Sequence, residues 1–528
     1  MGETRAIVIG GGHNGLVCAC YLARGGHSVT LLERRERLGG ACITEELWPG
    51  YRVSRAAYVL SLFRPRIVRE LELARHGLQL LPRTPASFTP LPDGRSLVLG
   101  SELEANVAEI RRFSEHDAQV YPAYEALLER IASAVEPTLD APPPELPIRR
   151  PRDLASWWLG LRGALRLGSD FPRALRLLLG PARELLEEHF DSEPLRSTLA
   201  TDAVIGAFAG PSSPGTGALL FHHVMGSLGG RRGVWAYVRG GMGGLTTALE
   251  RAARALGVSI RPDAAVRLLR SDGPAVTGVV LESGEELDAD VVASSLDPAR
   301  TFGALDEGAE LPEGFHRALA GIDYRSPVLK LNLALRTLPR FRADERDEQV
   351  LGGTIHLGPL DLDGLERAFE DARRDRGSER PVIELTIPSV LDPTLAPPGR
   401  HVASIFAQYA PALPTNDPRW PAIRDRMRDR ILATVDELAP GFSSSIEALE
   451  LLAPPDLERE FGLTGGNIFQ GAMTPDRMLF LRPVAGWSRY RTPLRGLYLC
   501  GAAAHPGGGV MGAPGRNAAL EILHRPRR

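Results

Sequence analysis

Short apolar runs alternate with helix-like segments at both ends of the chain. Residues 6–9 form an apolar run that predicts a buried parallel strand, a helical pattern follows it, and residues 28–33 predict the next strand. The tail repeats this order, with a strand expected over 497–500 and a helix beginning near Val510 or Met511. Strands that alternate with helices are typical of an α/β fold with a parallel sheet.

The middle of the chain has a different pattern. Helical spacing is found over 103–137 and 153–200, whereas the segments that alternate like strands are 326–336, 382–387 and 401–407. We therefore expect an α+β domain that is folded between separated pieces of the α/β domain.

Length and charge narrow the class of protein. The 528 residues exceed what one hydrophobic core can organise, so two or three domains are expected. The net charge of −3 gives no reason to expect nucleic acid as a partner. No apolar run is long enough for a spanning helix, and the first strand begins by Ala6, so neither a signal nor a transit peptide is expected. These features favour a cytoplasmic location for the protein.

The cysteines predict neither a redox centre nor a metal site. Cys18, Cys20, Cys42 and Cys500 form no C-x-x-C pair, and no cysteine or histidine cluster has ligand spacing. We interpret all four as small core residues.

A glycine-rich turn follows the first strand. Gly10, Gly12 and Gly15 form a G-x-G-x-x-G motif, and His13 and Asn14 lie between the last two glycines. The first glycine permits a tight turn, the second lets the backbone approach a pyrophosphate, and the third allows the helix to pack closely on the strand. The free N–H groups of the helix N-terminus then face the phosphates.

A carboxylate completes this motif. Glu33 ends the second predicted strand, 18 residues after Gly15, where it can bind ribose hydroxyls. The whole pattern of a strand, a glycine turn, a helix and a second strand that ends in an acid predicts a dinucleotide-binding site.

The residues after Glu33 decide between FAD and NAD. Arg34 and the arginine that follows it leave NADP open when they are taken alone. The doublet Gly39-Gly40, with Ala41 after it, resembles the extended FAD fingerprint of the flavoprotein superfamily that contains monoamine oxidases, phytoene desaturases and Rab GDP-dissociation inhibitors. The resemblance implies a Rossmann-type, glutathione-reductase-like FAD domain that is discontinuous in sequence, with FAD bound non-covalently.

Further cofactor contacts are implied by this resemblance. In the tail, Gly501, Val510 and Met511 would hold the isoalloxazine ring, and Val266 would contact the adenine through its backbone. Ala502 departs from the many FAD enzymes that have an acid there, but it agrees with the carotenoid desaturases.

Other candidate site residues lie near the expected flavin position, and one of them has two interpretations. By position, the segment 54–60 resembles the one that passes beside the flavin ring in this superfamily, which makes Arg55 and Tyr58 candidate liners. His505, before a proline, is either a catalytic group or a loop residue held by hydrogen bonds, and we favour the second.

Lys330 is the only lysine among the 62 lysines and arginines of the chain. An ammonium is compact and its pKa shifts readily, whereas a guanidinium is bulky and permanently charged. Lys330 lies between apolar strand neighbours and resembles the lysine that contacts flavin N5 through water in monoamine oxidases. It is either a flavin-facing catalytic residue, which we favour, or a lysine left by codon chance or by an ordinary ion pair.

Two segments bear on the substrate and its surroundings. Residues 203–230 contain no Asp, Glu, Lys or Arg and either line an apolar cavity or form plain core. Within them His222 and His223 are adjacent, so a helix would point them apart and neither is favoured as a base. Residues 152–183, with Trp157, Trp158 and six arginines, form either a solvated helix pair or a basic amphipathic face that contacts a membrane surface.

Long blocks, among them "ATDAVIGAFAGP" and "LYLCGAAAHPGGGVMGAPGRNAA", resemble the phytoene-desaturase-related family of pyridine nucleotide-disulfide oxidoreductase domain-containing protein 2. Its eukaryotic members are mitochondrial, so a chain without a presequence is expected to be a bacterial relative. The predicted domains are an FAD-binding domain (1–99, 237–303 and 490–528) and a substrate domain (100–236 and 304–489).

The predicted function is an FAD-dependent oxidoreductase that removes hydride from an apolar or amphipathic small molecule. A flavin amine oxidase is the alternative. A non-catalytic protein like the GDP-dissociation inhibitors is disfavoured, because the FAD fingerprint is intact. The sequence does not define the oligomeric state, the substrate or the electron acceptor.

Overall fold

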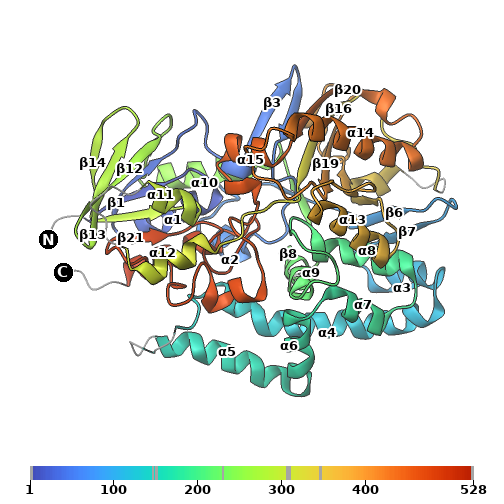
Figure 1. The fold of residues 1–528 in the computed structure, drawn as a ribbon, viewed down its shortest axis with the longest axis horizontal. Helices are drawn as coiled ribbons and strands as arrows, with labels where there is room; N and C mark the ends of the chain where they lie inside the picture. Colours follow the sequence, from blue (N-terminus) through green and yellow to red (C-terminus); the bar gives the residue numbers. More distant parts are fainter. Residues whose placement is uncertain are drawn as a thin grey trace.

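The computed structural model describes residues 4–145, 148, 153–228, 231–304, 311–343 and 348–524. Two sheets organise the chain, a parallel one near the two termini and a larger, mainly antiparallel one on the other side of the molecule (Figure 1). Among the described residues, no helix is both long enough and apolar enough to cross a bilayer.

The parallel sheet has five strands in the order β11-β2-β1-β15-β21. Their bounds are Ser259–Arg261, Ser28–Leu32, Arg5–Ile9, Val291–Ser294 and Leu497–Leu499. Ala6 and Val8 of β1 pack in one core with α1 (His13–Arg24), α10 (Gly243–Ala255) and α16 (Ala513–Leu523). Ile7 and Ile9 point to the opposite face and pack against the antiparallel sheet of β12 (Val266–Asp272), β13 (Ala275–Leu281) and β14 (Glu286–Asp288). Both faces are buried, which is why the strand consists of apolar residues without alternation.

The larger sheet has seven strands in the order β20-β16-β19-β18-β17-β6-β7. Their bounds are Ile446–Leu452, Leu329–Leu335, His401–Gln408, Val382–Thr386, Thr354–Leu357, Ser87–Pro90 and Ser96–Leu99. All neighbours are antiparallel except β6 and β17. Leu329, Leu331 and Leu333 of β16 share a core with α14 (Trp420–Leu438), so the residues between them, Lys330 and Asn332, lie on the other face of the sheet.

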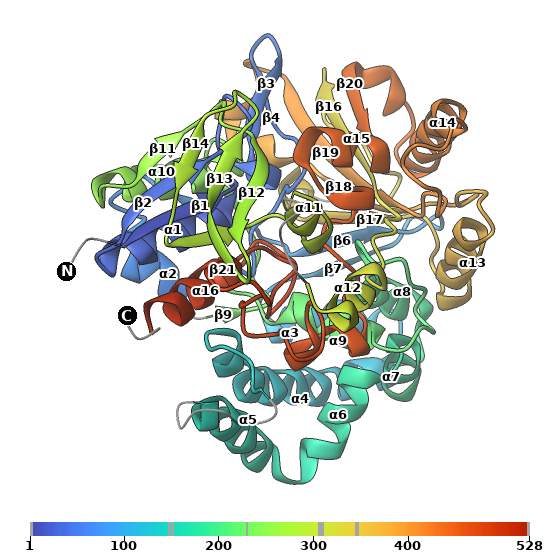
Figure 2. The ribbon, with the colours of Figure 1, turned by 60° about the vertical axis from the view of Figure 1, so that its left-hand side comes forward.

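A layer of helices lies beside this sheet and extends to the bottom of Figures 1 and 2. It contains α3 (Leu103–Arg111), α4 (Glu115–Leu139), α5 (Asp153–Leu167), α6 (Phe171–Leu179), α7 (Ala182–His189), α8 (Glu193–Val204), α9 (Thr216–Val224) and α13 (Leu362–Arg373). Their apolar faces form one core. In both views α5 and α6 lie at the outer edge of the layer.

Shorter elements connect these layers. The helices are α2 (Pro65–Glu70), α11 (Pro298–Gly303), α12 (Glu313–Ala320) and α15 (Pro454–Phe461). Three two-stranded ribbons pair β3 (Thr44–Trp48) with β4 (Tyr51–Ser54), β5 (Leu80–Pro82) with β10 (Ala236–Val238), and β8 (Ser227–Leu228) with β9 (Arg231–Arg232).

The architecture confirms the predicted class, a Rossmann-type α/β domain combined with an α+β part, and corrects two details. The prediction assigned residues up to 99 to the FAD domain, but β6 and β7 belong to the seven-stranded sheet because β6 pairs with the distant β17. The tail helix begins at Ala513 and not near Val510 or Met511, since Gly512, with a φ of 71°, turns the chain immediately before it. The predicted domain boundaries otherwise stay a prediction.

Candidate functional site

A cavity of about 420 Å³ opens at the carboxyl ends of the central parallel strands. It is lined by Ile9 at the end of β1 and Gly10 after it, by Leu32 at the end of β2 and Glu33 after it, and by Ser295 after β15. Ligands of open parallel sheets bind in this position, where loops leave the strand ends.

Two glycine turns meet at this end of the cavity. Gly10 has a φ of 95°, which favours glycine, and a Cβ on Gly15 would lie 2.0 Å from the carbonyl oxygen of Gly10. A Cβ on Gly40 would lie 3.2 Å from Cα of Gly12. The backbone of both turns therefore approaches the cavity without intervening side chains.

The side chains around these turns are suited to a polar ligand. Glu33 is 7% exposed and accepts hydrogen bonds from the backbone N–H groups of Gly11 (2.7 Å) and Arg35 (3.0 Å), which leaves lone pairs for hydroxyl groups. His13 Nε2 and Asn14 Oδ1 are buried atoms without a hydrogen-bond partner among the described residues, and both side chains line the cavity. Buried polar atoms are normally paired, so these two indicate a ligand that is not part of the chain.

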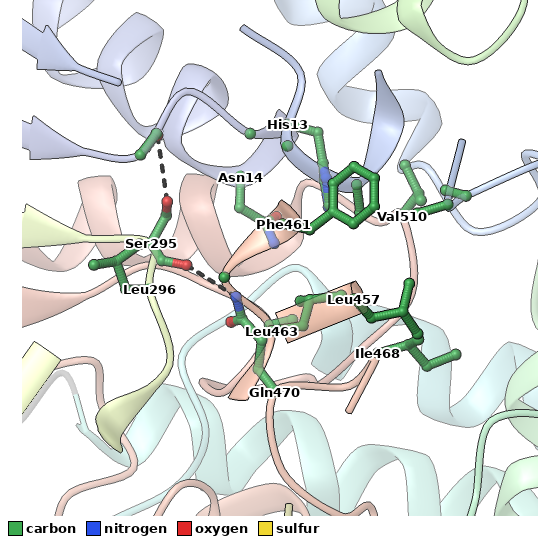
Figure 3. Close-up of a pocket in the computed structure, with 18 of the residues that line it drawn as sticks. His13, Asn14, Ser295, Leu296, Leu457, Phe461, Leu463, Ile468, Gln470 and Val510 are labelled. Carbon is green, nitrogen blue, oxygen red and sulfur yellow. Dashed lines mark hydrogen bonds between the residues drawn. The ribbon is translucent and has the colours of Figure 1, made fainter. Parts of the chain in front are cut away.

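The cavity brings together most of the predicted site residues. Those that line it are Gly10, Gly12, His13, Asn14, Glu33, Arg34, Gly40, Ala41, Val266, Lys330 and Val510. Figure 3 shows His13, Asn14 and Val510 at the cavity together with Phe461 and Ile468.

Five predicted residues lie outside the lining. A Cβ on Gly39 would contact Ile43, and one on Gly501 would lie 2.2 Å from the carbonyl oxygen of Ser295, so these glycines allow close packing, as Gly15 does. Met511 is fully buried in the core of the helical layer.

Arg55 is the fifth. Its guanidinium pairs with Glu45 (2.9 Å), Glu450 (2.6 Å) and Glu460 (3.3 Å), and the side chain is 11% exposed. Arg55 is not among the lining residues, although its partner Glu460 is, and its predicted position beside the flavin stays a prediction.

Lys330 lies on the cavity-facing side of β16 and is 1% exposed. Its Nζ donates hydrogen bonds to Asn332 Oδ1 (2.7 Å) and to Ser404 Oγ, and lies 5.4 Å from the centre of the Tyr58 ring. Burial lowers the pKa of Lys330 to about 7, against the opposing effect of the Glu450 carboxylate. The site thus holds a compact amine that can exchange a proton near neutral pH.

A buried carboxyl group, Glu384, and a second, half-buried one, Asp202, lie near Tyr58. The Tyr58 hydroxyl donates to Glu384 Oε2 at 2.5 Å, and Glu384 is 5% exposed. Burial, together with the charge of Asp202, raises the pKa of Glu384 to about 7. Burial also raises the pKa of Asp202 to about 7, against the effect of Arg83.

Sheet register explains how the lysine and the acid come together. Phe406 of β19 pairs with Lys330 on one side and with Glu384 of β18 on the other, so the three side chains form a row across adjacent strands. The ring of Tyr58, 5.6 Å from that of Phe406, covers this row.

Residues 15–523 match the model of the flavin containing amine oxidoreductase family. The chain belongs to that family. This flavoprotein is 46% identical over 99% of its length to pyridine nucleotide-disulfide oxidoreductase domain-containing protein 2 of Mus musculus, 93% of which is covered, and the predicted relationship to that family is confirmed.

Two more distant proteins extend the comparison. Phytoene desaturase (lycopene-forming) of a Paracoccus species is 26% identical over 97% of the flavoprotein, with 95% of the desaturase covered. The crystal structure of an oxidoreductase from Methanosarcina mazei superposes with a TM-score of 0.64 at 17% identity, covering 99% of this chain and all of the other, and supports the fold. The flavoprotein is an FAD-dependent oxidoreductase, as the sequence predicted.

The histidines differ in position. His223 lines the cavity, with its ring stacked on Trp235 and Nδ1 near the carbonyl oxygens of Asp202 and Leu219. His222 contacts the carbonyl oxygen of Gly508 through Nε2, and His505 that of Thr138; neither lines the cavity. Burial lowers the pKa of His222 to about 3 and that of His505 to about 4, so both rings are neutral supports of the chain.

Sequence reasoning missed one wall of the cavity in this flavoprotein. Residues from α15 and the loop after it line this wall: Leu457, Glu460, Phe461, Gly462, Leu463, Ile468, Phe469 and Gln470. Gln470 Nε2 donates to the carbonyl oxygen of Ser295 at 3.2 Å, which ties the wall to the parallel sheet (Figure 3). No local motif marks these residues, because only tertiary packing brings them to the glycine turns.

Proposed function

We propose that this flavoenzyme dehydrogenates an apolar or amphipathic organic molecule. The observation that carries the proposal is the cavity wall around Lys330 and Tyr58, to which Ile205, Val328 and Phe406 contribute. Trp235, Ile468 and Phe469 add further apolar surface. Such a wall excludes water and favours a largely hydrocarbon substrate. The relative that is a phytoene desaturase supports the same class of substrate.

The cofactor-binding roles are part of this proposal. Gly10, Gly12 and Gly40 would let the pyrophosphate approach the backbone, and Glu33 would accept hydrogen bonds from ribose hydroxyls. His13 Nε2 and Asn14 Oδ1, which lack partners among the described residues, would be paired by the bound dinucleotide. FAD held in this way would be non-covalent, and when bound it supplies the oxidant that accepts hydride.

Side chains of the protein would transfer protons and orient the reacting groups. Lys330, whose amine has a pKa of about 7, would hold a water molecule or a proton at the substrate end of the cavity. Removal of two hydrogens from a substrate also releases a proton. The Tyr58 hydroxyl can receive that proton as its own passes to the Glu384 carboxylate, because the two groups share a hydrogen bond.

A flavin amine oxidase remains a second candidate, and one observation favours it. Glu384 and Asp202 place two carboxyl groups behind the aromatic rings of Tyr58 and Phe406, an arrangement that would attract an ammonium group.

Purified protein tests both proposals. We expect flavin bands in the visible spectrum, and anaerobic bleaching of these bands by polyenes or other unsaturated lipids. Bleaching by amines alone would select the second candidate. Absence of flavin bands, with no uptake of added FAD, would contradict both.

We also infer a bacterial origin. The replacement of lysine by arginine at nearly every basic position is typical of a GC-rich genome. An intron-free gene among bacterial neighbouring genes would support this inference, and a gene with introns would contradict it.

A further inference from the structure

Helices α5 and α6 carry a row of large apolar side chains that point into solvent. Seven such side chains are each between 42% and 68% exposed: Leu154, Trp158, Leu161, Leu165, Phe171, Leu175 and Leu179. They are seven of the twelve large hydrophobic side chains that are exposed among the described residues, although α5 and α6 are only two of the helices. An exposed apolar area of this kind marks an interaction surface.

The orientation of α5 is determined by its packing. Leu154, Trp158, Leu161 and Leu165 follow one another at intervals of four, three and four residues, which places them on one face of the helix. Gly163 lies roughly on the opposite face, where a Cβ would come within 2.9 Å of the carbonyl oxygen of Ala134 in α4. The apolar row is therefore directed away from the protein.

Helix α6 repeats this arrangement. Its buried residues are Ala174 and Leu177, which join the core of the helical layer. Phe171, Leu175 and Leu179 are spaced four residues apart and lie on the exposed side. Both rows lie at the outer edge of the molecule, where no other described element covers them (Figures 1 and 2).

Among the described residues, the unpaired charge beside these rows is positive and lies on α5. Arg162 and Arg166 lie on α5 and are exposed, and Arg173 and Arg176 lie on α6. Among the side chains that the structure describes, no ion pair joins Arg162 or Arg166 to an acid, whereas the α6 arginines pair with Asp170, Glu184 and Glu188. This positive edge belongs to a protein whose net charge is −3, so it is a local feature.

We propose that the outer face of α5 and α6 docks on the surface of an anionic lipid bilayer. The apolar side chains would enter the boundary between headgroups and acyl chains, with Trp158 at the interface. Arginine side chains can extend from such a helix toward lipid phosphates. A second copy of this chain fits less well, because symmetric pairing of this face would bring Arg162 and Arg166 close to the same charges of the partner.

Vesicle sedimentation of the full-length holoprotein tests the proposal. We expect the protein to sediment with vesicles of phosphatidylcholine and phosphatidylglycerol, to bind pure phosphatidylcholine vesicles weakly, and to lose affinity as salt is raised. The double variant Arg162→Gln/Arg166→Gln should lower the affinity for the anionic vesicles about 30-fold. The double variant Leu161→Gln/Leu165→Gln should abolish binding.

Matched controls separate the surface from general effects. Leu103→Gln removes an exposed leucine from α3, and Arg317→Gln removes an exposed arginine from α12; both should bind vesicles as the parent protein does. Visible flavin absorbance and thermal unfolding confirm that each variant is folded. Because vesicle binding requires no substrate, the outcome does not depend on the proposed reaction.

Two results would overturn the proposal. One is equal sedimentation with anionic vesicles by the parent protein and by the Leu161→Gln/Leu165→Gln variant, or no sedimentation of either. The other is a dimer of the parent protein in light scattering that the same variant abolishes, which would assign the face to a second copy of the chain.

Discussion

Lys330 Nζ lies 5.4 Å from the centre of the Tyr58 ring, and the hydroxyl of that ring donates to the buried carboxylate of Glu384. The aromatic ring thus lies between a lysine and an acid that both have a pKa of about 7.

Substitution Lys330→Met should slow the reoxidation of dithionite-reduced flavin by oxygen about 100-fold, since it removes the only amine at this end of the cavity. Stopped-flow absorbance measures the rate. Lys330→Arg should not rescue it, because a guanidinium does not fit the position between Asn332, Ser404 and Tyr58. Unchanged rates in both variants would make Lys330 an ordinary buried cation.

Glu384→Gln should change how stability depends on pH. The pKa of Glu384 is raised from 4.5 to about 7 in the folded protein, so between these values the folded state binds more protons than the unfolded state. The stability of the parent protein should therefore fall as pH rises from 4.5 to 7, by about 3 kcal/mol at most from this group. Chemical denaturation gives the free energy of unfolding of parent and variant across this range, and the difference between the two should shrink toward low pH. A difference that does not change with pH would contradict the prediction.

Tyr58→Phe should raise the pKa of Glu384 further, because the Tyr58 hydroxyl stabilises the ionised carboxylate by donating to it. Infrared titration of the protonated carboxyl band measures this pKa, and Glu384→Gln identifies the band. A pKa that stays the same or falls would show that the hydrogen bond does not form in solution.

Gly15→Ala should reduce both FAD content and stability. The added methyl would lie 2.0 Å from the carbonyl oxygen of Gly10, so α1 must move away from the glycine turn, at a cost of about 1–3 kcal/mol. Gly100→Ala is the control, because nothing lies within 4 Å of a Cβ at that position. Flavin-to-protein absorbance ratios and melting temperatures report the result, and equal values for the two variants would show that Gly15 is not needed for close packing.

The local cofactor signature was readable from the sequence because its constraints are local. Gly10 and Gly12 are needed where backbone must approach a ligand, and Glu33 has to end the neighbouring strand. A buried parallel strand is a short continuous apolar run, whereas the helix that follows it has apolar residues at helical spacing. Because these two patterns differ, the order of strand and helix could be predicted.

Other features were decided only by the tertiary structure. The pairing of β6 with β17 joins segments that are far apart in the chain, and no local pattern encodes such a pairing. The three glutamates that pair with Arg55 come from separate segments of the chain, so their cluster could not be predicted from the sequence.

The unusual lysine illustrates both cases. That a compact cation stands in an apolar strand at position 330 could be predicted from the chain alone, because β16 alternates between two faces. That Phe406 and Glu384 lie in the same row, covered by Tyr58, depends on the folded arrangement of three other segments. The physical reason is that periodicity specifies which face a side chain occupies, whereas the partners on that face come from strands and loops whose register depends on the whole fold.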